Sequence, residues 1–168
     1  DGILSAIGRS FAWIFAPLGW GDWKAAVAAI TGLVAKENVV GTFGILYGFA
    51  EVSDEGEEIW GTLASSFTAI SAMSFMVFNL LCAPCFAAMG AIKREMNNAK
   101  WFWFAIGYQC LLAYVVSLCI YQIGSVVTGG AFGIGTVVAI LLVVGFLYLL
   151  FRPYKESETL KVKKTAKA

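Results

Sequence analysis

Three side chains in this apolar sequence could bind a cation: Cys82, Cys85 and Glu37. Cys82 and Cys85 form a C-x-x-C pair around Pro84, a spacing used by zinc sites, iron–sulfur clusters and thiol redox proteins. A soft thiolate beside a harder carboxylate suits a borderline transition metal such as Fe²⁺ better than Mg²⁺ or Ca²⁺. The alternatives are that both cysteines pack as small apolar side chains and that Glu37 lies near a membrane interface.

Other metal and catalytic chemistries find little support in the sequence. The chain has no histidine, so the imidazole ligands of haem and of most catalytic zinc sites are missing. A four-cysteine zinc site needs a second close pair, but Cys110 and Cys119 would lie on opposite faces of one helix. We expect those two to pack as apolar side chains. No catalytic residue is assigned. Among the alternative functions, the sequence favours an enzyme that exchanges thiols through the C-x-x-C pair least.

The elements that must position these side chains are membrane helices. Of the 168 residues, 60% are hydrophobic and only 14% are charged, whereas soluble domains carry about 25% charged residues. The mean hydropathy is +0.78, so lipid must be the solvent for much of the chain. The net charge of +1 is not gathered into a basic stripe, which excludes nucleic acid as a partner.

The pattern predicts an all-α polytopic integral membrane protein with about four transmembrane segments, some of them broken or re-entrant. Phe102–Ile123 and Ala131–Phe151 carry no formal charge and can each cross a hydrocarbon core of about 30 Å. Thr62–Ile92 is longer than one span needs and contains Pro84, which predicts a broken span. Trp23–Tyr47 is the fourth candidate span.

Glu37 lies near the middle of that fourth candidate, between Lys36 and Asn38. An ionisable group at this depth is costly unless it faces protein, water, an ion or a partner charge. We therefore interpret Glu37 as a carboxylate that lines a hydrated path. The preceding stretch Ile3–Leu18 is short and contains Arg9, so it is interpreted as an interfacial or re-entrant helix.

Charged loops predict the orientation of the spans. The positive residues lie between the broken span and the next one, and after the last span, which predicts that both segments are cytoplasmic. The loop Glu51–Glu58 carries five acids and no base, which fits the outer side. The positive residues on which this orientation depends are Lys93, Arg94, Lys100, Lys155, Lys161, Lys163, Lys164 and Lys167. Four tryptophans at predicted span ends are expected to form an interfacial belt: Trp20, Trp23, Trp101 and Trp103.

Three segments together resemble one family. They are IFAPLGWGDW (Ile14–Trp23), TGLVAKENVVGT (Thr31–Thr42) and NLLCAPCFAAMGAIKRE (Asn79–Glu95). The chain resembles the second Gate domain of the bacterial ferrous iron transport protein B family, from about Ile3 to the last membrane helix. The first residue is Asp1 rather than methionine, which agrees with a piece of a longer protein.

The resemblance implies the C-terminal membrane part of an importer that carries Fe²⁺, as substrate, into the cytoplasm across the bacterial inner membrane. GTP and Mg²⁺ would bind only in an N-terminal GTPase domain outside this chain, since no G-x-x-x-x-G-K-[ST] loop occurs here. The expected partners are the lipid bilayer, the rest of the transporter, small cytoplasmic accessory proteins and a further copy of the chain. Cys85 matches the family's proposed metal-handling cysteine and Glu37 its Ala-Lys-Glu acid, whereas Cys82 lies outside the match.

We divide the chain into four parts on this basis. Residues 1–20 are the interfacial or re-entrant helix, 21–124 a Gate-like transmembrane region with broken helices, 125–152 the last transmembrane helix and 153–168 a basic cytoplasmic tail. Gate domains are also similar to parts of nucleoside permeases. A coupled nucleoside-type permease and a membrane scaffold that transports nothing therefore stay as alternatives.

Overall fold

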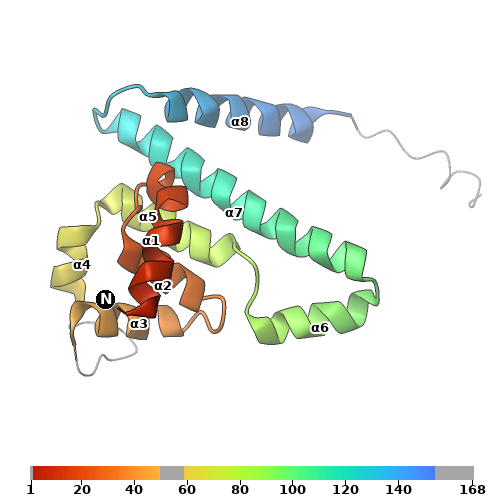
Figure 1. Cartoon of the computed structure of the whole chain (residues 1–168). Helices are drawn as coiled ribbons and strands as arrows, with labels where there is room; N and C mark the ends of the chain where they lie inside the picture. Colours follow the sequence, from red (N-terminus) through yellow and green to blue (C-terminus); the bar gives the residue numbers. More distant parts are fainter. Residues whose placement is uncertain (1, 50–58, 154–168) are drawn as a thin grey trace, which may run out of the picture.

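The computed structural model describes residues 2–49 and 59–153, and every regular element in those ranges is a helix (Figure 1). This confirms the predicted all-α class. In chain order the elements are α1 (Ile3–Phe15), the 3₁₀ helix η1 (Ala16–Leu18), α2 (Trp23–Thr31), α3 (Asn38–Tyr47), α4 (Trp60–Ser66), α5 (Ala69–Leu81), α6 (Phe86–Met96), α7 (Ala99–Val127) and α8 (Ile134–Phe151). The acidic loop and the lysines of the tail, which the predicted orientation used, lie outside the described residues.

Three segments are long and apolar enough to cross a membrane: α5 with α6, α7, and α8. The shortest, α8, has 18 residues, which at about 1.5 Å per residue gives about 27 Å, close to the thickness of a hydrocarbon core. The spans predicted within α7 and α8 are confirmed. The connection between them lies later in the chain than the predicted spans imply, because α7 continues through Val127 and α8 begins at Ile134. Helix α8 then runs back above α7 (Figure 1).

The broken span is confirmed at Pro84. Helix α5 ends at Leu81 and α6 begins at Phe86, and the backbone of Cys82 and Cys85 is extended, with ψ of 167° and 160°. Proline has no amide hydrogen and clashes with the preceding helical turn, so one continuous helix is excluded here. A further break, which the sequence did not indicate, separates α4 from α5, where Thr68 caps the start of α5 through reciprocal hydrogen bonds with Ser71.

The fourth predicted span, Trp23–Tyr47, is wrong as a single element. Helix α2 ends at Thr31, six residues of turn follow, and α3 begins at Asn38. The fourth candidate span is instead the pair formed by Ile3–Leu18 and α2, which meet at 98° and form either a broken span or a re-entrant loop. Gly19 permits the bend, because its φ of +86° is a left-handed conformation that side chains rarely adopt.

The core is centred on Trp20, which follows this bend. Its ring stacks on Phe15 at 4.4 Å between centroids and meets Phe75 and Phe78 edge-on at 5.0 and 5.3 Å. Only 2% of Trp20 is exposed. The expectation that Trp20 belongs to an interfacial belt is therefore wrong: the bend after η1 turns this residue inward, and it anchors the N-terminal helices on α5.

A buried polar contact joins η1, α5 and α7 beside this aromatic core. Ser74 and Ser117 have no exposed surface, and their hydroxyl oxygens lie 2.7 Å apart. The Ser74 hydroxyl also lies 2.9 Å from the carbonyl oxygen of Leu18, and the Ser117 hydroxyl donates to the carbonyl of Ser74. Small hydroxyl residues let membrane helices approach closely and bond to one another. These two serines therefore hold the bent N-terminal segment against the two longest spans.

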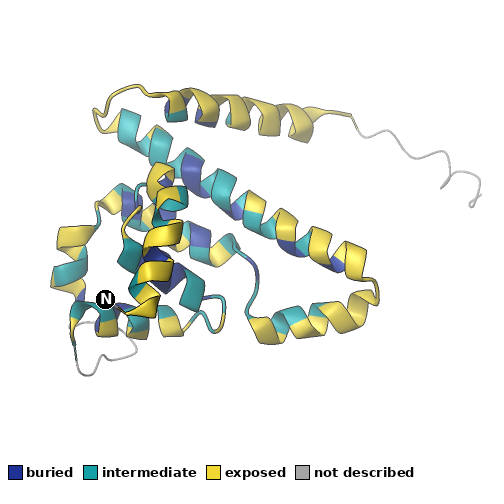
Figure 2. Cartoon of the chain, viewed as in Figure 1, coloured by how far each residue is buried: buried dark blue, intermediate teal, exposed yellow. Residues whose placement is uncertain are grey.

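The surface that remains is strongly apolar. Helices α6 and α8 are exposed along most of their length (Figure 2), and only Thr136 and Ala139 of α8 are buried. A water-soluble protein would not expose such a helix, whereas lipid or further membrane helices can cover it without cost. The predicted multi-pass membrane character follows from the described residues themselves.

Candidate metal-handling site at two helix breaks

The first helix break carries Glu37. The last turn of α2 is fastened to α3 by a hydrogen bond of 3.1 Å between the hydroxyls of Thr31 and Thr42. Glu37 is the residue before α3, its side chain is exposed, and it does not bond to the free amides of the helix. The helix amides therefore leave the carboxylate oxygens available to a ligand.

The second break carries the two cysteines. Cys82 is the residue after α5, and Cys85 is the residue before α6. Cys85 is half-buried and, like Glu37, forms no side-chain bond with the amides of the helix that follows. Each predicted ligand of the family match thus occupies the same place: it is the last residue before the half-helix that follows a break, and its side chain makes no capping hydrogen bond to that helix.

One hydrogen bond joins the two breaks. The ammonium group of Lys36 donates to the carbonyl oxygen of Leu80, 3.2 Å away, although the residues are 44 positions apart. Leu33, in the first break, packs against the small buried cluster that Cys82 also contacts. A carbonyl in the last turn of a half-helix carries partial negative charge. The end of α5 therefore already holds one cation, the side chain of Lys36.

The structure does not bring the predicted ligands into one closed site. No hydrogen bond joins Glu37 to Cys82 or Cys85, and residues 2–49 and 59–153 contain no group of three or more Cys, Asp or Glu side chains that could hold a metal ion. Such an arrangement resembles a lined path more than a permanent metal centre, in which three or four protein ligands enclose the ion.

Two residues in this region were not predicted as participants. Lys36 makes the hydrogen bond between the two breaks, to the carbonyl of Leu80. Cys110 of α7 was expected to pack as an apolar residue, yet its sulfur lies 4.0 Å from that of Cys82. No spacing in the sequence signals this contact, because Cys82 and Cys110 lie 28 residues apart on either side of α6. The sulfur of Cys119 faces the carbonyl of Ala139 instead.

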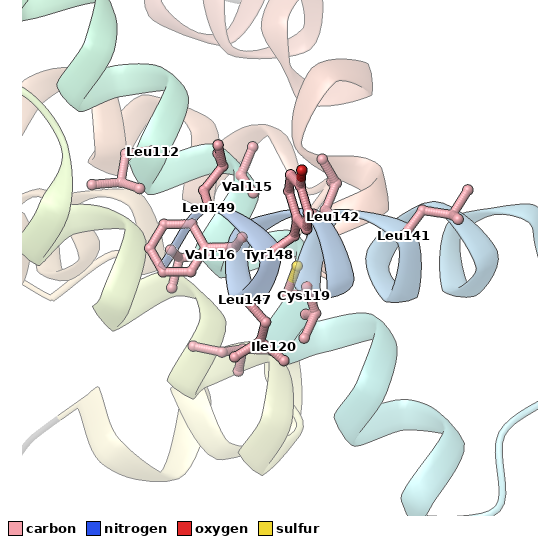
Figure 3. Close-up of a pocket in the computed structure, with 13 residues that line it drawn as sticks. Leu112, Val115, Val116, Cys119, Ile120, Leu141, Leu142, Leu147, Tyr148 and Leu149 are labelled. Carbon is pink, nitrogen blue, oxygen red and sulfur yellow. The ribbon is translucent and has the colours of Figure 1, made fainter. Parts of the chain in front are cut away.

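A groove of about 680 Å³ lies away from both breaks, between α7 and α8. Aliphatic side chains from both helices line it, with Tyr148 at one side (Figure 3). Cys119 is its only thiol, and no charged residue contributes to its wall. Such a surface suits hydrocarbon rather than an ion, so the chemistry of the chain belongs to the breaks.

Comparison with known proteins places these features in a family. The family model of the Gate domain, described as nucleoside recognition, matches residues 1–99. The Fe(2+) transporter FeoB of Methanocaldococcus jannaschii is 42% identical over 122 residues, which are 73% of this chain and 17% of that protein. No solved structure matches the chain.

Two further relatives cover nearly the same part of the chain. The Fe(2+) transport protein A/Fe(2+) transporter FeoB fusion protein of Porphyromonas gingivalis is 40% identical over 72% of this chain and 15% of its own length. The Fe(2+) transporter FeoB of Staphylococcus aureus strain COL is 33% identical over 72% of this chain and 18% of its own length. The chain thus spans less than a fifth of these relatives. The match confirms the predicted family: this chain belongs to the Gate family and is similar to a short membrane region of FeoB transporters.

Proposed function

We propose that this chain is the C-terminal transmembrane portion of a ferrous iron importer and forms part of its permeation path. The observation that carries the proposal is the pair of helix breaks joined by Lys36 and Leu80, in a chain similar to proteins named Fe(2+) transporters. Membrane transporters bind their substrates where helices are interrupted, because backbone groups freed there can replace water around an ion.

Three side chains are assigned to the path. Cys85 supplies a sulfur ligand and Glu37 an oxygen ligand, and each is the residue before a half-helix. Cys82 is a third candidate on the other side of Pro84. Fe²⁺ accepts both thiolate and carboxylate ligands, and the carbonyls at the ends of α2 and α5 add oxygen ligands. An ion passing these groups exchanges ligands stepwise rather than entering a closed cage.

The rest of the transport cycle is assigned to parts outside this chain. GTP and Mg²⁺ would act in a separate GTPase domain, because the sequence holds no phosphate-binding loop of that type. Small cytoplasmic accessory proteins and further copies of the chain are the other proposed partners. The chain itself carries transport rather than catalysis in this proposal.

We assign the C-terminus to the cytoplasm of a bacterial cell. Lys93, Arg94 and Lys100 flank the turn between α6 and α7, and positive residues near membrane ends favour the cytoplasmic side. Because α7 and α8 form a hairpin of two spans, the residues after α8 return to the same side as this turn.

The test is uptake of radiolabelled Fe²⁺ by cells expressing the full-length protein. Cys85→Ser and Glu37→Gln should each reduce uptake about tenfold or more, since even supporting residues of metal sites contribute that much. Cys119→Ser is the matched control, because this thiol faces a backbone carbonyl in the bundle. Uptake that stays undiminished at equal expression in both variants would contradict the assignment.

The description of the Gate family favours one second candidate, a coupled permease for a nucleoside. In that case Glu37 would handle protons, and excess nucleoside would compete for uptake while Fe²⁺ would not. The same competition assay therefore separates the two substrates. A scaffold without transport would instead tolerate Glu37→Gln and Cys85→Ser together.

A further inference from the structure

Two thiols from different helices face each other beside the second break. The sulfur of Cys82, which directly follows α5, lies 4.0 Å from the sulfur of Cys110 in α7. Both side chains are free thiols and both are half-buried. They are neither sealed in the core nor fully exposed to lipid, so a small solute that reaches the break can reach them.

The two cysteines have different backbone environments. Cys110 belongs to the middle of a continuous 29-residue helix, so its backbone position is fixed by regular hydrogen bonds. Cys82 lies just beyond the end of α5, where its ψ is 167° and only its amide still bonds to the helix, through the carbonyl of Phe78 at 2.8 Å. Both sulfurs pack against a buried cluster made of Ala83, Phe102 and Ile106. The pair is thus held together by packing from α6 and α7.

The distance between the sulfurs fits a bridging cation. A disulfide requires about 2.05 Å between sulfurs, so the observed pair is far from that bond. Two cysteines bound to a tetrahedral zinc ion, with Zn–S bonds of about 2.3 Å, have their sulfurs about 3.8 Å apart. The observed 4.0 Å is close to this value.

We propose that Cys82 and Cys110 form a two-thiol binding site for a thiophilic d¹⁰ cation of the Zn²⁺ and Cd²⁺ class. On binding, each thiol releases its proton to water as a metal–sulfur bond forms. Within the described part of the chain no third Cys, Asp or Glu joins this pair, so water or backbone carbonyls complete the coordination. The bound cation ties the break between α5 and α6 to α7 and withdraws Cys82 from the proposed iron path.

The experiment is a Cd²⁺ titration of the full-length protein in lipid nanodiscs, followed by the ultraviolet absorption of the cadmium–thiolate bond. Cys82→Ser and Cys110→Ser should each weaken Cd²⁺ binding about tenfold or more, and the double variant should lose little beyond either single change. Cys119→Ser, on the same helix as Cys110, should bind Cd²⁺ as the unchanged protein does. Helix content by circular dichroism checks that each variant is folded.

A second measurement tests the proximity of the Cys82 and Cys110 thiols separately from Cd²⁺ binding. With the other cysteines replaced by serine, copper–phenanthroline oxidation should link Cys82 to Cys110. Linkage with unaltered Cd²⁺ affinity in both single variants would show that the thiols merely touch, and would overturn the proposal. Absence of both linkage and a Cd²⁺ effect would overturn it as well.

The result is independent of iron transport. Cys85→Ser should lower Fe²⁺ uptake but leave the Cd²⁺ titration unchanged, because Cys85 is not a member of the pair. Loss of uptake in that variant with normal Cd²⁺ binding therefore supports both proposals. Normal uptake with a Cd²⁺ effect confined to Cys82 and Cys110 would retain the dithiol site and refute only the iron path.

Discussion

Replacing Ser74 by alanine tests how the bent N-terminal segment is held in the bundle. The Ser74 hydroxyl lies within hydrogen-bonding distance of three oxygens: the carbonyls of Leu18 and Ser117, at 2.9 and 3.1 Å, and the Ser117 hydroxyl at 2.7 Å. One hydroxyl has a single proton to donate, and the Ser117 hydroxyl gives its proton to the Ser74 carbonyl, so the Ser74 hydroxyl is the donor to one of these three oxygens. Ser74→Ala removes that donor and leaves a wholly buried oxygen without it.

The size of the effect follows from these contacts. A hydrogen bond between membrane helices contributes about 0.6 kcal/mol on average and about 1.7 kcal/mol at most. A buried polar group left without its partner costs about 1–3 kcal/mol. Because both serines have no exposed surface, we expect Ser74→Ala to lower the free energy of unfolding by about 1–2 kcal/mol.

Denaturant unfolding in mixed lipid–detergent micelles, followed by circular dichroism, measures this change. Ser66→Ala is the control, because its exposed hydroxyl bonds only within its own helix, to Thr62, and the change should stay within about 0.5 kcal/mol. The double replacement of Ser74 and Ser117 should cost less than the two single costs added together, since the hydroxyls share their bonds. A Ser74→Ala protein as stable as the control, or costs that add fully, would refute the shared-bond reasoning.

Two further replacements test other contacts. Lys36→Met removes the hydrogen bond that the Lys36 side chain donates to the Leu80 carbonyl. Because Lys36 is half-exposed, we expect the free energy of unfolding to fall by about 1 kcal/mol or less. Fe²⁺ uptake by the folded variant should fall as well, since this bond joins the two breaks. Gly124→Val places a side chain against Ile70, where even a Cβ would lie 2.8 Å from a methyl carbon, and should destabilise by about 1–3 kcal/mol. Gly107→Ala on the same helix meets no atom within 4 Å and should be neutral or stabilising, as thermal unfolding can show.

The helix breaks at Glu37 and Pro84 have local causes in the sequence, unlike the break between α4 and α5. Pro84 removes a backbone donor, so its break needs no knowledge of tertiary contacts. The charged pair Lys36–Glu37 is too costly for the middle of a lipid-facing span, and the structure places both residues at the end of a turn, outside the helices. Local chemistry therefore located both candidate regions along the chain.

The pairing of segments into spans could not be read in the same way. Trp23–Tyr47 has the length of a span, but length does not say where the chain bends. The 98° angle between Ile3–Leu18 and α2 depends on the left-handed Gly19 and on Trp20 entering an aromatic core built with Phe75 and Phe78. Those partners come from α5, far along the chain, so the composition of a local window cannot identify them.

The cysteine pair shows why a spacing rule can miss a site. Within one helix, Cys110 and Cys119 face different directions, which argues against a shared metal, and the structure agrees that their sulfurs have different partners. The partner of Cys110 is instead in the extended segment after α5. Helix α5 ends at Leu81, and the Cys82 sulfur, at the first residue beyond it, lies 4.0 Å from the Cys110 sulfur in the neighbouring α7. The pairing of the two cysteines therefore depends on how α5 packs against α7, which the spacing of cysteines within either segment cannot show.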